Sequence, residues 1–338
     1  MRKSFLGAVG IAAASVLLFA GCAGGGTPTS TGATGGGAKA SYKIGISQFV
    51  QHPALDAAAE GFQAAFKDAG IDATFDIQNA NADQATATSI SQKFASSDVD
   101  LVLAIATPAA QAAANAIADK PVLFTAVTDP VSAELVKSQE APGGNVTGTS
   151  DMNPVADQIA LIQEFLPNAK TVGIIYSSGE VNSEVQVAAA KAAATAKGLT
   201  IKEATVTTSA DVATAAAGLG QVDAIYIPTD NRVTEGFESV VQYAEANKVP
   251  LFGAEVNQVN RGAIATLGLD YYKLGHQTGE MAIKILKDGA DPATLAVETQ
   301  SQFDLVINEQ AAAAQGVTIP ESVKARAVKP TASATATS

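Results

Sequence analysis

The chain has 338 residues, enough for two domains of about 100–200 residues each, and 47% of them are hydrophobic. Acidic residues outnumber basic ones by 33 to 21, and the net charge of −12 disfavours nucleic acid as a partner, because its phosphates would be repelled. One cysteine and two histidines exclude an internal disulfide and a Cys/His metal cluster, so neither a metal nor another cofactor is predicted.

Residues 1–22 are typical of a secretory signal. Arg2 and Lys3 precede an uncharged apolar run, 5–20, which is short for a membrane span. Small residues then lead to Cys22 in a pattern that resembles the bacterial lipobox, with Phe19 where that motif usually has Leu. We expect Cys22 to be lipidated and to anchor the protein on the extracytoplasmic side of the cell membrane. The alternative is an unmodified, buried cysteine in a plain signal peptide.

Two segments outside the folded part have low complexity. Residues 23–41 are rich in Gly and Thr and hold no large apolar side chain, so they are expected to form a flexible tether with a reach of about 20–25 Å. Residues 329–338 are similar and are expected to be a disordered tail. The folded part is therefore predicted to run from Tyr42 to Val328.

Between these ends, apolar or β-branched runs alternate with helical patterns. Strands are predicted at 43–49, 73–78, 101–106, 122–127, 145–150, 171–177, 200–206, 223–229, 250–255, 263–268 and 303–308. Helices are predicted at 53–70, 83–96, 108–119, 129–138, 153–166, 182–197, 211–219, 231–248 and 271–287. Strands that are apolar throughout indicate parallel sheets covered by helices on both faces. The predicted fold class is α/β, with two doubly wound parallel-sheet lobes.

Polar side chains gather directly after the predicted strands, where open α/β sheets bind ligands. They include Thr107, Thr128, Asp129, Asp151, Ser177, Ser178, Thr229, Asp230, Asn231 and Glu255. Hydroxyls and helix N–H groups suit a carboxylate and acids suit an ammonium, so together they suit a zwitterion. Each residue alone is more simply a helix cap, and only their accumulation at one end of both sheets favours binding.

The remaining candidates each have a structural interpretation beside the functional one. Phe49 and Tyr176, near strand ends, either pack in the core or contact an apolar ligand group, whereas Tyr226 lies inside its strand and is expected in the core. His52 and His276 have no catalytic partner at a motif spacing and are expected to be structural, although His52 could line the mouth of a cleft. No nucleophile elbow, P-loop or dinucleotide-binding motif follows a strand, so no enzyme activity is predicted.

Seven segments resemble the bacterial ABC-transporter substrate-binding lipoproteins of the tryptophan/tyrosine type. They are IGISQFVQHPALDAAAEGF (44–62), IATPAAQAAAN (105–115), FTAVTDPV (124–131), PGGNVTGTSDM (142–152), DAIYIPTDN (223–231), PLFGAE (250–255) and LDYYKLGHQTGEMAIKIL (269–286). The resemblance implies a periplasmic-binding-protein type I fold with a three-crossover hinge, near Asp151, Asp270 and Ala293. Lobe 1 would then comprise 42–150 and 270–292, and lobe 2 would comprise 151–269 and 293–328.

The resemblance also points to cleft residues by position. They are Phe49, Thr107, Pro108, Asp129, Asp151, Tyr176, Thr229, Asp230, Asn231, Glu255 and Asp270. We expect Thr107 and Thr229 to hold a ligand carboxylate, Asp151 or Asp230 to hold its ammonium, and Phe49 and Tyr176 to contact its side chain. The chain has no Trp, so any aromatic stacking falls to Phe or Tyr.

The function expected from both arguments is that of a lipid-anchored receptor without catalytic activity. It would bind an amino acid between the lobes, an aromatic one (Trp, Tyr or Phe) on the resemblance, and deliver it to the permease and ATPase subunits of an ABC importer. The alternatives are a branched-chain or other apolar amino acid, or a nucleoside; a sugar is less favoured without Trp. A secreted hydrolase with an Asp/Glu pair, or a receptor-linked sensor using the same cleft, also stays open.

Overall fold

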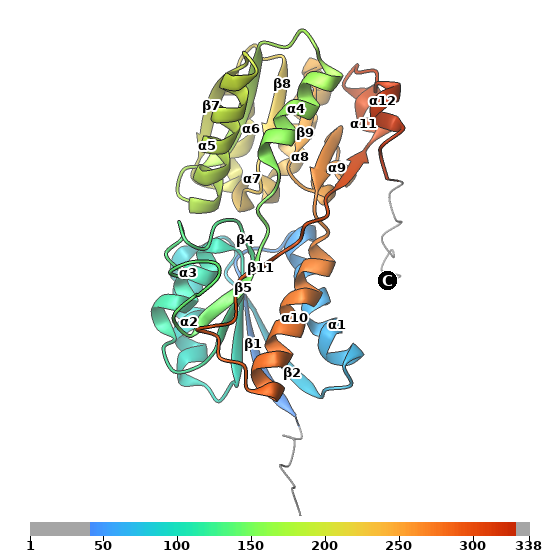
Figure 1. The fold of residues 1–338 in the computed structure, drawn as a ribbon. Coiled ribbons are helices and arrows are strands. Elements are labelled where there is room, and N and C mark those ends of the chain that lie inside the picture. Colours follow the sequence, from blue (N-terminus) through green and yellow to red (C-terminus); the bar gives the residue numbers. More distant parts are fainter. Residues whose placement is uncertain (1–40, 329–338) are drawn as a thin grey trace, which may run out of the picture. The chain divides into compact units, whose positions relative to one another are not determined.

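The structure, a computed structural model, describes residues 41–328 (Figure 1). The predicted signal, the lipidation site Cys22, the tether and the tail lie outside these residues. Within 41–328, no helix is long and apolar enough to cross a membrane.

Lobe 1 is built on a six-stranded sheet in which every neighbouring pair of strands is parallel, in the order β11-β5-β4-β3-β1-β2. Its strands are β1 (Tyr42–Gln48), β2 (Ala73–Asn79), β3 (Leu101–Ile105), β4 (Val122–Val127), β5 (Val146–Ser150) and β11 (Glu298–Thr299). Its helices are α1 (Pro53–Asp68), α2 (Gln84–Ser96), α3 (Thr107–Ala116) and α10 (Tyr271–Asp288). The pair α1 and α10 covers one face of the sheet, and the pair α2 and α3 covers the other (Figure 1). β3 and β4 are buried along their whole length, as their unbroken apolar sequences predict.

The contact between α1 and α10 is unusually close, because glycines face it from both helices. A Cβ at Gly275 of α10 would lie 1.9 Å from the carbonyl oxygen of Ala58, and one at Gly61 of α1 would lie 2.0 Å from that of Tyr272. The beginning of α10 is therefore held beside the beginning of α1, at the end of lobe 1 that faces lobe 2.

Lobe 2 is built on a four-stranded parallel sheet in the order β7-β6-β8-β9, with a separate antiparallel pair, β10 and β12. Its strands are β6 (Thr171–Ser177), β7 (Thr200–Val206), β8 (Ala224–Ile227), β9 (Leu251–Gly253), β10 (Ala265–Gly268) and β12 (Asp304–Ile307). Its helices are α4 (Val155–Phe165), α5 (Val181–Ala196), α6 (Val212–Gly218), α7 (Asn231–Glu235), α8 (Phe237–Asn247), α9 (Val256–Asn260), α11 (Glu309–Ala314) and α12 (Glu321–Lys324), with a short 3-10 turn, η1 (Ser209–Asp211).

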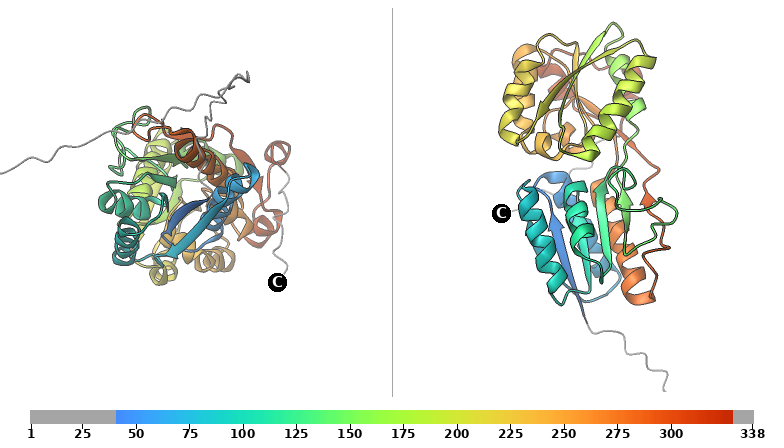
Figure 2. Two further views of the ribbon diagram at one scale, coloured as in Figure 1. Left: turned by 90° about the horizontal axis from the view of Figure 1, so that it is seen from below. Right: turned by 90° about the vertical axis from the view of Figure 1, so that its left-hand side faces the viewer.

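Three segments connect the lobes and lie together at one edge (Figures 1 and 2). They follow β5, β10 and β11. Two hydrogen bonds hold these connections together. The Tyr271 hydroxyl, just after the second connection, donates to Asp151 in the first at 2.6 Å. Gln300 Nε2 in the third connection donates to the Asp270 carbonyl in the second at 3.0 Å. The third crossover was expected near Ala293, but Glu298 and Thr299 pair with β5, so the chain leaves lobe 1 only after Thr299.

The predicted α/β fold with parallel sheets is confirmed, although individual elements differ; the helix predicted at 231–248, for example, is divided into α7 and α8. β10 ends at the hinge and β12 begins there, which makes this pair antiparallel. The helix expected at 129–138 is a series of turns, because Glu134 adopts a left-handed backbone (φ 59°) that a helix cannot continue.

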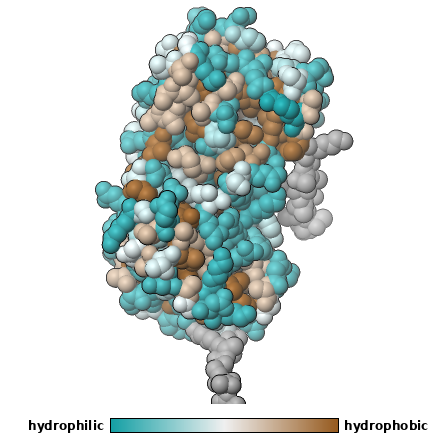
Figure 3. Space-filling view, viewed as in Figure 1, coloured by the Kyte–Doolittle hydropathy of each residue, from teal (hydrophilic) through white to brown (hydrophobic). Residues whose placement is uncertain are grey.

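Hydrophilic residues cover most of the face drawn in Figure 3. Hydrophobic residues gather mainly on lobe 2, where a groove is lined by Leu161, Leu267, Phe303, Leu305 and Val328, among others.

Candidate functional site

A small, nearly closed cavity lies between the lobes, with about 20 Å³ of space for the centre of a water-sized sphere. Almost all of its lining follows the carboxyl ends of strands, the position at which open α/β sheets bind ligands. Lobe 1 contributes His52, Ala54, Leu55, Ala126, Thr128 and Tyr271; the first connection contributes Asp151; lobe 2 contributes Asn182, Thr229, Asp230, Asn231, Thr234 and Glu255.

Asp151 is buried in the first connection between the lobes. Its two oxygens accept one hydrogen bond each, from the Thr128 hydroxyl at 3.1 Å and the Tyr271 hydroxyl at 2.6 Å. Burial raises the pKa of Asp151, and these two hydrogen bonds oppose the rise. A carboxylate can accept about four hydrogen bonds, so Asp151 keeps capacity for a ligand donor.

Glu255 follows β9 and caps α9. Its Oε2 accepts the Asn257 backbone N–H at 2.6 Å, while its buried Oε1 has no partner. Burial raises the pKa of Glu255 to about 7. Burial, and then the charges of Asp151 and Glu255, raise the pKa of the Tyr271 hydroxyl, so both carboxyl groups lie near the same phenol.

Asp151 and Glu255 both line the cavity. Among residues 41–328, none of the ion pairs includes either of them, although the charge of Arg261 opposes the effect of burial on the pKa of Glu255. A buried carboxylate outside an ion pair is costly, so the cavity favours a cationic group from outside the protein.

The beginning of α1, which reaches the cavity, favours an anionic group. This 16-residue helix begins with Pro53 and has no side-chain cap, so the N–H groups of Ala54 and Leu55, in its first turn, have no partner within the helix. His52 directly precedes this helix. Burial lowers the pKa of His52 to about 4, although its side-chain hydrogen bond with Asn231 opposes this effect. The imidazole is therefore neutral at pH 7. The Nδ1 atom of His52 has no partner. An uncapped helix N-terminus attracts an anion.

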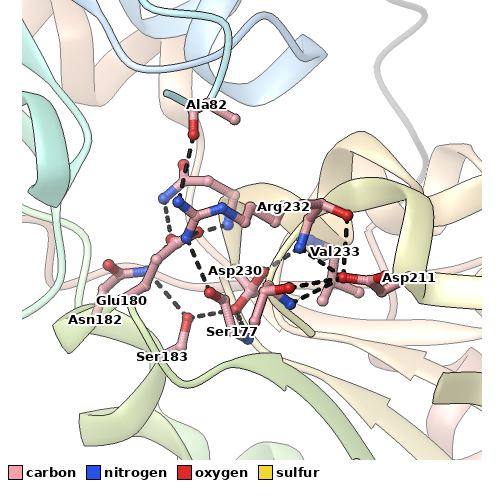
Figure 4. Close-up of polar contacts among 12 residues, drawn as sticks. Ala82, Ser177, Glu180, Asn182, Ser183, Asp211, Asp230, Arg232 and Val233 are labelled. Carbon is pink, nitrogen blue, oxygen red and sulfur yellow. Dashed lines mark hydrogen bonds and ion pairs between the residues drawn. The ribbon is translucent and has the colours of Figure 1, made fainter. Parts of the chain in front are cut away.

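A second acidic cluster lies in lobe 2, and its Asp230 also lines the cavity (Figure 4). Asp230 caps α7 and accepts three hydrogen bonds, from the Val233 N–H at 2.8 Å, the Ser177 N–H at 2.5 Å and the Ser183 hydroxyl at 2.6 Å. Glu180 accepts from Asn231 and forms an ion pair with Arg232 at 3.4 Å. Burial, and then the charge of Asp230, raise the pKa of Glu180 to about 7. Asp230 is thus occupied by the protein itself.

Five of the eleven predicted cleft residues line the cavity, namely Asp151, Thr229, Asp230, Asn231 and Glu255. Their role in binding stays a prediction. Phe49, Thr107 and Pro108 are buried but do not line the cavity.

The other three predicted residues lie elsewhere and have partners of their own. Tyr176 donates to Glu203 on β7 at 2.9 Å. Asp129 accepts the Val131 and Ser132 N–H groups, and Asp270 caps α10 by accepting the Lys273 N–H at 3.1 Å. Asp129 and Asp270 are therefore the capping residues that the simpler interpretation predicted.

Eight lining residues are not among the eleven predicted cleft residues, namely His52, Ala54, Leu55, Ala126, Thr128, Asn182, Thr234 and Tyr271. The strand-end rule did name Thr128, and His52 was considered for the mouth of a cleft. Tyr271 stands shortly after β10, so the same rule could have found it. Asn182 and His52 carry unpartnered polar atoms, Oδ1 and Nδ1. Which atoms of a side chain lack a partner is a property of the folded chain, and no sequence pattern reports it.

Comparison with known proteins places the chain in a family. A family model for ABC transporter substrate-binding proteins matches residues 43–331. The chain is 43% identical over 276 residues to a tyrosine-binding protein of Clostridioides difficile (strain R20291), with 80% of each protein covered. Solute-binding proteins at only 15–16% identity share the fold, which is that of periplasmic binding proteins of type I.

Two solved structures are similar to different degrees. An ABC domain from Streptococcus pneumoniae in complex with L-Trp is 40% identical, with a TM-score of 0.82 and 85% of this chain and 98% of that one covered. A ligand-free, open substrate-binding protein with adhesive properties from Clostridium difficile is 45% identical, but its TM-score is 0.64, with 83% and 96% covered. The match to the family model spans nearly all of the described residues, and the chain belongs to the family of ABC transporter substrate-binding proteins.

Proposed function

We propose that this protein captures a free amino acid with an aromatic side chain between its lobes and delivers it, chemically unchanged, to the permease of an ABC importer. The single observation that carries the proposal is the pair of buried carboxyl groups, Asp151 and Glu255, which face the cavity without an ion-pair partner. An α-ammonium group supplies the missing charge and three N–H donors.

The two ends of a zwitterion then have separate places. The ammonium lies between Asp151 and Glu255, and the carboxylate lies at the uncapped beginning of α1, near the N–H groups of Ala54 and Leu55. This differs from the roles expected from the sequence. Thr107 does not line the cavity, and Asp230 has three donors of its own.

The aromatic nature of the side chain rests on the relatives, one of which is a tyrosine-binding protein and another of which was solved with L-Trp. Phe49 and Tyr176 do not line the cavity, so contact with the ring falls to Leu55, Ala126 and Tyr271. We further propose that Cys22 carries the lipid that holds the protein at the membrane. Labelling with a radioactive fatty acid should mark the wild type and fail to mark Cys22→Ser.

Calorimetry on the purified protein, with bound ligand removed, tests the binding site. We expect Tyr, Trp or Phe to bind, and Asp151→Asn and Glu255→Gln each to weaken binding by about 10- to 100-fold, since each removes a charge-assisted contact. Asp223→Asn is the matched control, because this carboxyl accepts the Lys170 and Thr171 N–H groups before β8, away from the cavity, and its loss should leave the affinity unchanged. Wild-type affinity in both cavity variants would contradict the proposal.

A further inference from the structure

One side chain reaches across from lobe 2 to lobe 1 (Figure 4). Arg232 belongs to α7 of lobe 2. Its Nη2 donates to the carbonyl oxygen of Ala82 at 3.3 Å, and its guanidinium lies 5.7 Å from the centre of the Phe49 ring. Ala82 and Phe49 both belong to lobe 1, and Arg232 itself does not line the cavity. Its contacts with lobe 1 therefore exist only while the lobes are together.

Lobe 2 fixes this arginine from behind. Its Nη1 donates to the Ser177 hydroxyl at 3.0 Å and lies 3.4 Å from Glu180, whose side chain is 0% exposed. Glu180 and Asp230 place two carboxyl groups in this buried cluster, and Arg232 is the cation beside them. These partners all belong to lobe 2, so they hold the guanidinium in place before the lobes meet. A guanidinium can bind a carboxylate and a carbonyl through its fixed N–H groups while its flat face lies over a ring, a geometry that the compact ammonium of lysine does not reproduce.

The part of lobe 1 that Arg232 contacts is a tight turn at Asn81 and Ala82. Asn81 and Ala82 are consecutive residues other than glycine with left-handed backbones, φ 51° and 58°. The turn is held by the Ala82 N–H donating to the Phe49 carbonyl at 2.8 Å, which brings the Ala82 carbonyl and the Phe49 residue to one place. Strained backbone of this kind concentrates at ligand clamps and switch regions.

We propose that Arg232 is a positioning residue that latches the two lobes in the closed arrangement, so that it strengthens ligand binding without touching the ligand. Contacts made only in the closed state shift the open–closed equilibrium and thereby the apparent affinity. The proposal rests on the proposed function for the identity of the ligand, but the closure that it describes is measured separately.

The test replaces Arg232 by lysine, which keeps the charge beside Glu180 and removes the planar group. Arg326→Lys is the matched control, because Arg326 also pairs with a carboxylate (Glu164) and donates to a backbone carbonyl oxygen (Ser322, 3.1 Å), both within lobe 2 and outside the cavity. Spin labels at Gln92→Cys and Glu245→Cys, exposed positions on α2 and α8, report the distance between the lobes in a Cys22→Ser background. The distance distribution is recorded with and without saturating tyrosine.

With Arg232→Lys we expect a larger open fraction, an increase in Kd of about 5- to 20-fold and faster dissociation. Arg326→Lys should match the wild type. Phe49→Leu should weaken binding in the wild type and change little in the Arg232→Lys background, because both substitutions break the same contact.

The latch would be overturned if the distance distributions and dissociation rates of Arg232→Lys equalled those of the wild type. It would also be overturned if the substitution lowered only the free energy of unfolding and left closure and dissociation unchanged. If tyrosine, tryptophan and phenylalanine all fail to bind the wild type, the proposed function falls. The distributions recorded without ligand then still decide the latch: a lower closed fraction in Arg232→Lys supports it, and identical distributions overturn it.

Discussion

Replacing Glu255 by glutamine separates the stability of the protein from its ability to bind. Folding buries this carboxyl and raises its pKa from an ordinary 4.5 to about 7. An acid whose pKa is raised by folding contributes stability that is fully present below pH 4.5 and is lost as the pH rises through 7. The difference corresponds to about 3 kcal/mol of unfolding free energy above pH 7. Glutamine has no proton to lose and stays neutral, and its side-chain carbonyl can still cap α9.

Urea unfolding of the ligand-free protein at pH 4.5 and pH 8 measures this effect. We expect Glu255→Gln to be more stable than the wild type by up to about 3 kcal/mol at pH 8, with the gain largely absent at pH 4.5. Glu245→Gln, an exposed position on α8, is the control and should follow the wild type at both pH values.

Ligand binding should show the opposite dependence on pH. An ammonium binds the ionised form of Glu255, so the wild-type Kd should rise about tenfold for each pH unit below 7. The variant should bind weakly, with a high Kd that changes little with pH. Parallel pH profiles for the wild type and Glu255→Gln, in stability and in binding, would refute the assignment of this carboxyl to the ammonium.

Three further predictions concern the scaffold around the site. Asp230→Asn should lower the unfolding free energy by about 1–3 kcal/mol, because the amide has one acceptor oxygen where the carboxyl has two, so at least one of three buried donors would face an NH2 group; a stable variant that has lost only binding would contradict this structural role. Gly275→Ala should lower the thermal midpoint markedly, since its Cβ would lie 1.9 Å from the Ala58 oxygen and overpacking costs about 1–3 kcal/mol or more; circular dichroism melts measure it. His52, with its pKa lowered to about 4, contributes stability that is present above pH 6.5 and lost as the pH falls through 4. Acid unfolding of His52→Gln should therefore start at lower pH than that of the wild type, and coincident curves would exclude the histidine as the cause.

The alternation of apolar runs and helical patterns was sufficient to predict the parallel sheets, because buried parallel strands need apolar side chains on both faces. The strand-end rule also located Asp151, Thr229 and Glu255 at the cavity. It could not separate these residues from Asp129 and Asp270, which follow strands equally and only cap local turns.

Other parts of the site depend on tertiary contacts that have no local signal. Tyr176 stands one residue before the end of β6, but its side chain meets Glu203 on the neighbouring strand. The latch residue Arg232 follows Asp230 and Asn231 directly, yet its importance lies in contacts with residues about 150 positions earlier in the chain. No periodicity or spacing connects those positions.

The close packing of α1 and α10 also constrains how the chain reaches its native state. The surface of α1 around Gly61 accepts only a backbone that approaches as closely as that of α10, and β11 completes the sheet from residues 298 and 299. The first half of the sequence therefore cannot finish its own core. During synthesis or export it stays incomplete until almost 300 residues have emerged, and a chain that stops before Tyr271 would present a bare groove of small residues to chaperones and proteases.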